Sequence, residues 1–422
     1  MNILNLNLPR CHFHTLIELA KSRQRVYTNH ETISYEYEAS LGIKALTKEE
    51  NKLIIKISQP GEFFFDEEHE IQYEKDKKEY GLKLIQQLID KYNIDILQVS
   101  IPDLAYLHTH FKDKIKYIGP SEEASLLETN KLYAKNLAKE IGLKTPDIIK
   151  HGKYLEEDYC KDLSLPAIEK PSNMWTPAVV INNEKEIEQL ISKVGMWPRH
   201  LNNDYYIEEF LHDIIETNVY FVISNGKYVI EYTQEIMGEG LNKTIIPSVW
   251  YSDAYIKPLS PSLDKIARQT AEKYLKHIAK MGGSWEGSLC GAYTLSGEWY
   301  FLEINVRPDI FNSSPTFMTG DEYIKGMFED VSLFEKAWEN KTCEKYIITS
   351  NEGKEYPIHL HDKYNVSYPN NLVIKDGKYF ISDYGVQHIS DRGTVVADHN
   401  IPKEFIKEVE ETTPWRFNNE PK

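Results

Sequence analysis

Three polar side chains near residue 305 have the types and spacing to hold a metal ion beside a phosphate group. Residues 299–307 read WYFLEINVR, and strand side chains alternate between two faces, so Glu303, Asn305 and Arg307 share one face if the strand continues that far. Carboxylate and amide oxygens two residues apart suit a hard cation such as Mg²⁺, and an arginine suits a phosphoryl group. An edge strand with a polar face gives the same alternation, so this run alone does not decide between the two interpretations.

Two lysines and a short loop are candidates for binding an anion. Lys170 ends the otherwise apolar run 165–170, where a lysine either extends its ammonium to solvent or contacts an anion. The loop 171–177 offers Ser, Asn and Thr donors but no glycine, so by itself it is a weak phosphate cradle. Lys131 falls in the first turn of a helix expected over 130–141, where most lysines are solvated.

Acidic residues follow a third predicted strand. The run 205–211 reads YYIEEFL and includes Glu208 and Leu211, and Glu216 lies five residues beyond Leu211. Exposed acidic residues are ordinary in this chain, which has 65 Asp and Glu against 49 Lys and Arg, a net charge of −16. That charge disfavours non-specific binding to nucleic acid or to anionic membranes.

Composition and cysteine spacing indicate a soluble protein of a reducing compartment. With 41% hydrophobic residues the chain has enough apolar side chains for a large core, and no run approaches the roughly 18 apolar residues of a membrane span. The N-terminus lacks the pattern of a signal peptide, so we expect a cytoplasmic protein. The cysteines form no CxxC pair, which argues against a zinc ribbon or a disulfide framework. They are Cys11, Cys160, Cys290 and Cys343.

Periodicity predicts alternating strands and helices at the N-terminus and hairpins later. A helix over 81–92 and a buried strand over 94–99 suggest a parallel α/β layer, without a GxGxxG turn for a dinucleotide. Asn225-Gly226 between two apolar runs predicts a type I′ hairpin, and a long helix is expected around 266–278. The last 90 or so residues read as an α+β region with strands near 371–383.

The order of these motifs resembles the ATP-grasp superfamily, and within it the glycinamide ribonucleotide synthetase (phosphoribosylamine–glycine ligase) family. The resemblance is good over about 117–310 and looser elsewhere. It rests on the series Gly119-Pro120-Ser121, Asn130-Lys131, Thr145-Pro146, the 166–170 and 207–211 runs, Glu216, and Phe301 to Arg307.

The resemblance implies an ATP-grasp fold, α/β and α+β, preceded by a Rossmann-like α/β domain. We expect this N-terminal domain at 1–118, the ATP-grasp region at 119–330 and a C-terminal α+β region at 331–422. Within the ATP-grasp region, the lid is expected at about 145–232 and the metal-binding sheet at about 240–312. ATP would lie between the two antiparallel sheets.

The resemblance also implies a role for each motif residue. Lys131 and Lys170 would contact ATP phosphates, Glu208 and Leu211 would meet adenine through the backbone, and Glu216 would lie near the ribose or phosphates. Glu303 and Asn305 would bind Mg²⁺ or Mn²⁺, and Arg307, with Lys170, would act on the transferring phosphoryl group.

The implied reaction is ATP-dependent C–N ligation, in which phosphorylation turns a carboxylate into an acyl phosphate that an amine attacks. The resemblance implies two substrates: glycine or another amino acid, and a phosphoribosylamine-like or other amine. The pathway would be purine synthesis or a specialised one. Many ATP-grasp proteins dimerise, which makes a homodimer the matching expectation.

Two regions depart from the synthetase pattern and bear on its substrates. The first turn reads Leu8-Pro9-Arg10-Cys11-His12 without the family's glycines, although Arg10 and His12 retain the chemistry for an anion. The segment after Arg307 also differs, and Asn312 and Ser313 are acceptor-site candidates by their proximity to it. ATP and Mg²⁺ therefore follow from the series more firmly than glycine and phosphoribosylamine.

Two other functions compete with a ligase. Three His-x-His pairs, at 12/14, 108/110 and 359/361, could ligate zinc in a metal-dependent hydrolase if each lay on a strand. A non-catalytic ATP-binding ATP-grasp module is the other alternative, motivated by the glycine-free loop.

Overall fold

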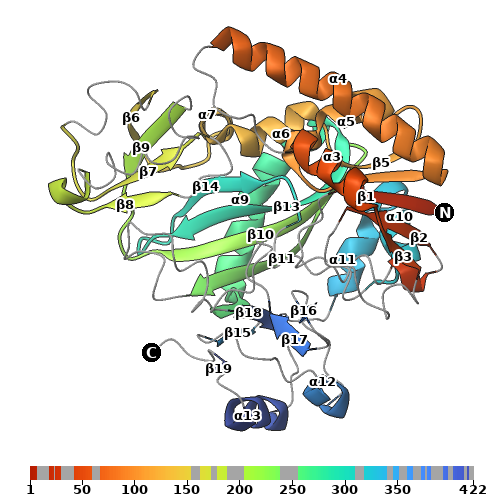
Figure 1. The fold of residues 1–422 in the computed structure, drawn as a ribbon. Coiled ribbons are helices and arrows are strands. Elements are labelled where there is room, and N and C mark those ends of the chain that lie inside the picture. Colours follow the sequence, from red (N-terminus) through yellow and green to blue (C-terminus); the bar gives the residue numbers. More distant parts are fainter. Residues whose placement is uncertain are drawn as a thin grey trace.

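The computed structural model shows a large central sheet, a small sheet beside it and a separate group of C-terminal elements (Figure 1). The residues it describes are 1–6, 19–22, 24–29, 42–58, 67–153, 162–172, 178–187, 204–237, 255–308, 318–339, 346–350, 359–364, 372–375, 378–381, 393–397, 403–412 and 416–417.

The large sheet has ten strands and joins a parallel half to an antiparallel half. Strand β1 (Asn2–Leu6) pairs in parallel with both β2 (Arg25–Thr28) and β4 (Ile96–Val99), and β4 pairs in parallel with β5 (Lys116–Pro120). This confirms the α/β layer expected at the N-terminus. In spatial order the strands are β12 (Tyr255–Pro258), β11 (Lys227–Met237), β10 (Ile215–Ser224), β13 (Gly283–Tyr293), β5 (Lys116–Pro120), β4 (Ile96–Val99), β1 (Asn2–Leu6), β2 (Arg25–Thr28) and β3 (Ile43–Ala45), with β14 (Trp299–Asn305) pairing β13.

Strand β5 connects the two halves. It runs parallel to β4 on one side, and on the other side its last residues, Gly119 and Pro120, pair antiparallel with Ser284 and Gly283 of β13. The domain boundary that we expect near residue 119 therefore falls inside a continuous sheet. Ser121 follows, and its hydroxyl accepts a hydrogen bond from the Ala124 N–H (3.0 Å), which confirms it as the N-cap of the next helix.

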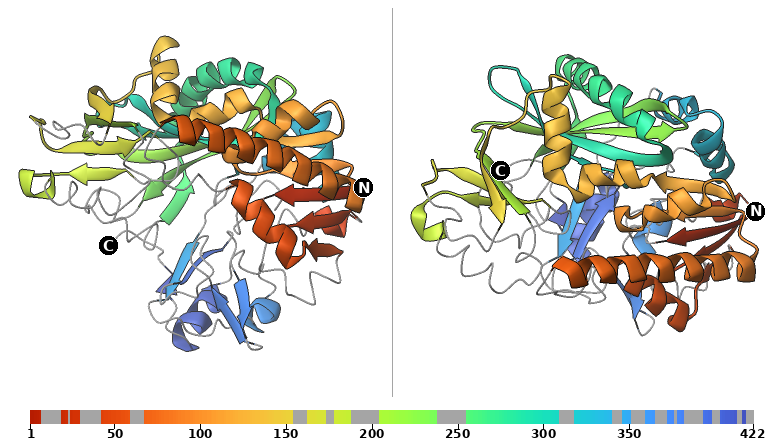
Figure 2. Two further views of the ribbon diagram at one scale, coloured as in Figure 1. Left: turned by 45° about the horizontal axis from the view of Figure 1, so that its top comes forward. Right: turned by 90° about the horizontal axis from the view of Figure 1, so that it is seen from above.

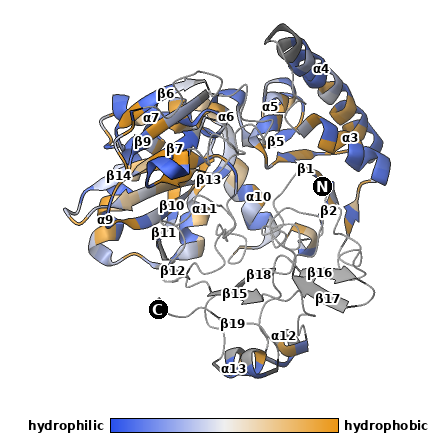
Figure 3. Ribbon diagram, turned by 60° about the vertical axis from the view of Figure 1, so that its left-hand side comes forward, coloured by the Kyte–Doolittle hydropathy of each residue, from blue (hydrophilic) through white to orange (hydrophobic). Residues whose placement is uncertain are grey.

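Helices cover the faces of this sheet (Figure 2). Figure 3 shows apolar and polar residues alternating along α3 (Lys48–Ser58) and α4 (Glu67–Tyr92), as amphipathic helices require. Helix α9 packs its apolar face on the antiparallel half, where the Tyr274 ring stacks on Phe301 at 5.0 Å. The helices are α3 (Lys48–Ser58), α4 (Glu67–Tyr92), η2 (Pro102–Leu104), α5 (Tyr106–Phe111), α6 (Glu122–Thr129), α7 (Lys131–Glu140), α9 (Pro261–Ile278), η4 (Ala279–Met281), α10 (Gly320–Phe328) and α11 (Ser332–Trp338).

The small sheet, on the left of Figure 1, has the strand order β6-β9-β7-β8. Its strands are β6 (Ile148–Lys153), β9 (Asp204–Glu209), β7 (Ala167–Pro171) and β8 (Val179–Ile181). The next hairpin, β10–β11, turns at Asn225 (φ 49°) and Gly226 (φ 77°), which confirms the expected type I′ turn. That hairpin pairs with β13, so the expected lid range of 145–232 crosses from the small sheet into the large one.

The C-terminal elements lie at the bottom of Figure 1. The strands expected near 371–383 are confirmed as the β16–β17 hairpin. The elements are β15 (Tyr346–Ser350), α12 (His359–Tyr364), β16 (Leu372–Lys375), β17 (Lys378–Ile381), β18 (Gly393–Ala397), α13 (Lys403–Thr412) and β19 (Arg416–Phe417). Among the helices in the described ranges, none combines the length and apolar character needed to cross a membrane.

The close contact between β5 and β13 yields a stability prediction. A Cβ added to Gly283 (φ 85°) would lie 2.5 Å from the Gly119 carbonyl oxygen and 2.9 Å from the Ser121 nitrogen. Gly297 has a similar φ of 80°, but no atom lies within 4 Å of its added Cβ. Both alanine substitutions carry the cost of a positive φ, about 1–2 kcal/mol. Gly283→Ala should lower the free energy of unfolding by roughly 2 kcal/mol more than Gly297→Ala, because of overpacking.

Urea unfolding of the two variants beside the unsubstituted chain measures this difference. Equal losses of stability would show that the β5–β13 contact is looser than described.

Candidate active site

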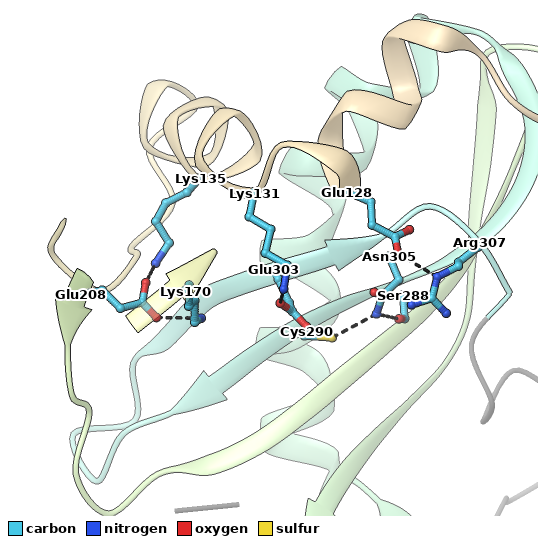
Figure 4. A network of polar contacts seen from close by, with 10 residues as sticks. All are labelled: Glu128, Lys131, Lys135, Lys170, Glu208, Ser288, Cys290, Glu303, Asn305 and Arg307. Atoms are coloured by element: carbon cyan, nitrogen blue, oxygen red, sulfur yellow. Dashed lines mark hydrogen bonds and ion pairs between the residues drawn. The ribbon is translucent and has the colours of Figure 1, made fainter. Parts of the chain in front are cut away.

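The two metal-binding candidates, Glu303 and Asn305, lie on one face of β14, beside the neighbouring strand β13 (Figure 4). Glu303 pairs with Cys290 and Asn305 pairs with Ser288, whereas Ile304 between them is buried in the core. The Asn305 amide nitrogen donates to Ser288 Oγ (3.1 Å) and to Cys290 Sγ (3.6 Å). These contacts orient the amide, so that its nitrogen faces β13.

A β-bulge decides which residue of β13 faces Glu303. The register between β13 and β14 shifts between Cys290 and Gly291, so Gly291 pairs with Phe301 and Cys290 pairs with Glu303. A thiol therefore occupies the position directly across from the carboxylate.

Helix α7 brings Lys131 onto Glu303. The Asn130 side chain caps the helix by accepting a hydrogen bond from the Tyr133 N–H (2.9 Å), which fixes Lys131 at the first helical position. The Lys131 ammonium lies 3.3 Å from a Glu303 carboxylate oxygen. The charge of Lys131, with smaller effects from Lys170 and Arg307, lowers the pKa of Glu303 to about 2 against the opposing effect of burial. Glu303 is therefore anionic at neutral pH.

Glu128, in the last turn of α6, holds the chain that follows β14. Its buried carboxylate accepts hydrogen bonds from the Val306 N–H (2.8 Å) and from Arg307 Nε (2.7 Å). Burial raises the pKa of Glu128, and Arg307 acts in the opposite direction. Glu128 is absent from the set predicted from sequence, because a single glutamate in an acidic helix carries no signal of its own.

A second cluster of charged side chains joins α7 to the small sheet. The Glu208 carboxylate lies between two ammonium groups: Lys170 Nζ at 2.7 Å and Lys135 Nζ, with which it forms a hydrogen-bonded ion pair. All three side chains are buried. Burial lowers the pKa of Lys170 to about 8 and lowers that of Lys135 well below its usual value, with repulsion from Lys170 adding to the effect.

Lys135 was missed from sequence, although a signal for it existed. It follows Lys131 by four residues, so the two ammonium groups project from one face of α7. The start of α7 is also tied to the small sheet's loop, because the Lys131 N–H donates to the Ser172 carbonyl oxygen (2.8 Å).

The remaining predicted residues differ in where they lie. Glu216 is half-buried near the start of β10, and burial raises its pKa to about 7 while Lys170 opposes the rise. Leu211 follows the end of β9 and lies in the segment that leads to β10. Arg10, His12, Asn312 and Ser313 lie outside the described residues.

Two of the three His-x-His pairs lie on helices and not on the strands that the zinc interpretation requires. His108 and His110 belong to α5, where alternate residues project in different directions, and His108 packs edge-on against Tyr117 at 5.1 Å. The pair at 359/361 also lies on a helix, α12, and the pair at 12/14 lies outside the described residues.

The β14 face fits a hard cation that is completed by a phosphorylated ligand. Within the described ranges, no group of three His, Cys, Asp or Glu side chains could hold a metal ion. Glu303 and Asn305 supply a carboxylate and an amide, and Mg²⁺ characteristically uses one or two protein carboxylates with phosphate and water oxygens. The nearby ammonium groups of Lys131 and Lys170 suit the phosphates themselves.

Comparison with known sequences gives a partial match. The chain matches no protein-family model. It is 28% identical over 203 residues to D-alanine–D-alanine ligase from Campylobacter jejuni subsp. jejuni serotype O:23/36 (strain 81-176). The alignment covers 46% of this chain and 55% of the relative, so the chain spans about half the length of the curated relatives that it matches.

Solved structures match almost the whole chain. Biotin carboxylase from Campylobacter jejuni, in a complex with β-γ-ATP, has a TM-score of 0.63 at 14% identity and covers 99% of this chain and 93% of its own. The L-amino acid ligase from Bacillus licheniformis has a TM-score of 0.62 at 13% identity, with 100% and 99% covered. The chain has the ATP-grasp fold.

Phosphoribosylamine–glycine ligase from Thermotoga maritima is also similar, with a TM-score of 0.58 at 15% identity, covering 99% and 97%. The fold that the resemblance to the ATP-grasp superfamily implies is thereby confirmed, at sequence identities of 13–15%. The lysine and glutamate groups lie where the small sheet meets the large sheet (Figure 4).

The buried Glu208 group yields a second stability prediction. Glu208→Ala would leave the ammonium groups of Lys135 and Lys170 buried together without their carboxylate. Removing one partner of a buried ion pair costs about 3–5 kcal/mol, so we expect a loss of that size in the free energy of unfolding.

Glu298→Ala is the matched control, because it removes the partner of Lys144 in an exposed ion pair, and exposed pairs contribute little. Thermal and urea unfolding of both variants would test the difference. A Glu208→Ala chain as stable as the Glu298→Ala chain would mean that the two lysines are solvated or neutral.

Proposed function

We propose that the protein is an ATP- and Mg²⁺-dependent carboxylate–amine ligase that forms a C–N bond through an acyl phosphate. The observation that carries this proposal is the row of polar and charged side chains at the end of β14, with Lys131 of α7 beside it. Lys131 lies 3.3 Å from Glu303, and Asn305 and Arg307 follow at the next alternate positions of the chain. The row combines a cation-binding pair with groups that bind phosphate, within the fold that the solved structures share.

In this proposal Lys131 and Lys170 bind the phosphates of ATP. Leu211 and Glu208 meet adenine through the backbone of the segment that leaves the small sheet, and Glu216 lies near the ribose or phosphates. Glu303 and Asn305 would hold Mg²⁺ or Mn²⁺, which supplies positive charge to the phosphate oxygens when bound. Release of Lys131 from Glu303 would then free its ammonium group for a phosphate.

Arg307 is proposed to stabilise the phosphoryl group during transfer. Attack by the substrate carboxylate on the γ-phosphorus would break the bond to the ADP oxygen and give an acyl phosphate. Attack by an amine on the acyl carbon would expel phosphate and leave the amide. Positive charge and positioning account for most of the catalysis of phosphoryl transfer, so no nucleophilic side chain is required.

Glu128 has a positioning role in this scheme. It fixes the backbone at Val306 and the Nε edge of the guanidinium of Arg307. Pre-oriented charge of this kind lowers the reorganisation needed in the transition state.

An amino acid is the proposed carboxylate substrate. The supporting comparisons are the D-alanine–D-alanine ligase match and the fold of an L-amino acid ligase, both named for amino-acid substrates. A second amino acid is therefore the acceptor to test first, and a phosphoribosylamine-like amine the next. Arg10, His12, Asn312 and Ser313 remain proposed substrate contacts.

The direct test is release of ADP and phosphate from Mg²⁺-ATP over a panel of amino acids crossed with amines that include phosphoribosylamine generated in situ. We expect release only when one acid and one amine are present together. Glu303→Gln and Lys170→Ala should reduce this turnover by about 10²-fold or more, as loss of a charge-stabilising group typically does.

Glu298→Gln, on the exposed turn before β14, is the matched control and should leave turnover unchanged. ATP binding without turnover on any pair would favour the non-catalytic alternative, and normal turnover in both site variants would contradict the assigned roles.

The pKa of Lys170 predicts a pH dependence. Burial lowers this pKa to about 8, so the ammonium group loses its proton as pH rises through that value. Through this group, affinity for Mg²⁺-ATP should fall by up to about tenfold per unit as pH rises above 8. Lys170→Arg keeps its charge throughout, because a guanidinium titrates above pH 12, and should remove the decline.

Calorimetric titration with a non-hydrolysable ATP analogue between pH 7 and about 10 would measure this dependence, with Lys144→Arg as the exposed control. Parallel declines in the unsubstituted chain and the Lys170→Arg variant would assign the effect to another group.

A further inference from the structure

A pocket of about 550 Å³ opens beside the start of β5, away from the β14 face. It is lined by the end of α5, the segment 112–115, the first residues of β5, the β10–β11 turn, the start of β13 and the end of α10. We call it the β5 pocket. Its volume lies within the range of about 300–1,000 Å³ that is usual for small-molecule sites.

The lining of the β5 pocket is strongly basic in a chain whose net charge is −16. Three lysines, Lys112, Lys114 and Lys116, are among the lining residues, and Asp113 is the one acidic residue among them. No carboxylate in the described part of the chain lies within 4.0 Å of these three ammonium groups, unlike the other lysine groups around the β14 face. The pocket therefore gathers positive charge that no carboxylate of the described ranges pairs with at close distance.

Two of these lysines contact an aromatic or an imidazole group, and neither pairs with a carboxylate of the described ranges. Lys116 Nζ lies 5.1 Å from the centroid of the Phe328 ring, and Lys114 Nζ lies 2.6 Å from His110 Nε2. The half-buried His108 also lines the pocket, and its pKa is lowered first by burial and then by Lys112, with Asp113 opposing. A bound anion would relieve the mutual repulsion among these groups.

The β5 pocket is distinct from the ATP-grasp site. Its contact with β13 is at Gly283 and Ser284, whereas Cys290 faces Glu303 six residues farther along the same strand. At about 3.4 Å per residue, that separation is roughly 20 Å. Lys116 begins β5, so the pocket lies at the amino edge of the parallel half.

We propose that the β5 pocket is a second ligand site that binds the phosphate group of a small molecule. Lysine ammonium groups bind phosphate as point charges, and three of them match the charge of a phosphate dianion in the presence of one carboxylate. The Phe328 ring and Ile115 supply an apolar wall for the rest of a phosphorylated compound. Neither the pocket nor its test depends on the proposed ligase reaction.

The test is a titration of the full chain with inorganic phosphate and, separately, with glucose 6-phosphate, at constant ionic strength set with chloride. The ring signals of His108, assigned with a His108→Gln variant, report binding at this pocket rather than at the lysines of the ATP-grasp site. We expect saturable shifts of the His108 signals with at least one of the two ligands.

A pair of charge reversals separates specific binding from general electrostatics. Lys114→Glu with Lys116→Glu should weaken binding at least about tenfold, whereas Lys265→Glu with Lys273→Glu on the exposed side of α9 changes the net charge equally and should not. If the first pair impairs folding, the neutral pair Lys114→Gln and Lys116→Gln replaces it. Stronger binding of glucose 6-phosphate identifies a phosphorylated compound, and equal binding identifies free phosphate.

Absence of saturable His108 shifts with both ligands would overturn the proposal. So would equal weakening by the β5 pocket variants and the α9 control variants.

Discussion

Pairing of buried and half-buried lysine and glutamate side chains is the constraint on which the centre of this molecule depends. Three ammonium groups, from Lys131, Lys135 and Lys170, and the carboxylates of Glu208 and Glu303 meet where α7 passes between the two sheets. A buried charge is costly unless an opposite charge and hydrogen bonds accompany it. The small sheet, α7 and β14 must therefore keep their relative positions for these charges to remain paired. Burial shifts the pKa values of Lys170 and Glu216, and the charge of Lys131 lowers that of Glu303.

The rigid frame around this centre comes from the continuity of the large sheet. Because β5 pairs with both β4 and β13, the N-terminal α/β layer and the β14 face belong to one hydrogen-bonded structure. Glu128 adds a second connection, since it is presented by the helix that follows β5 and binds the chain that follows β14. The small sheet has no strand pairing to the large sheet in the described ranges. Its described links are α7, the segment 141–147, whose Lys144 carbonyl oxygen accepts a hydrogen bond from the Phe301 N–H, and the segment 210–214.

Much of this arrangement could be predicted from local sequence patterns. The period-two alternation in β14 and the Asn225-Gly226 turn are properties of a few adjacent residues, and the structure contains both the strand and the turn. The sequence could not show that the small sheet ends with β9 at Glu209 and that β10 belongs to the large sheet. An antiparallel strand has the same residue pattern in either sheet. Glu128 and Lys135 were missed since their partners, Arg307 and Glu208, are 179 and 73 residues away. The bulge that turns Cys290 toward Glu303 depends on register between strands, which a single strand's sequence does not encode.

The hydrogen bond from the Lys131 N–H to the Ser172 carbonyl oxygen has a mechanical consequence. Lys131 supplies the ammonium group on Glu303 through its side chain and anchors the small sheet's loop through its backbone. A swing of the small sheet about the 210–214 segment must either break that bond or pull on the first turn of α7. The position of the small sheet and the partner of Glu303 are therefore linked through one residue, Lys131.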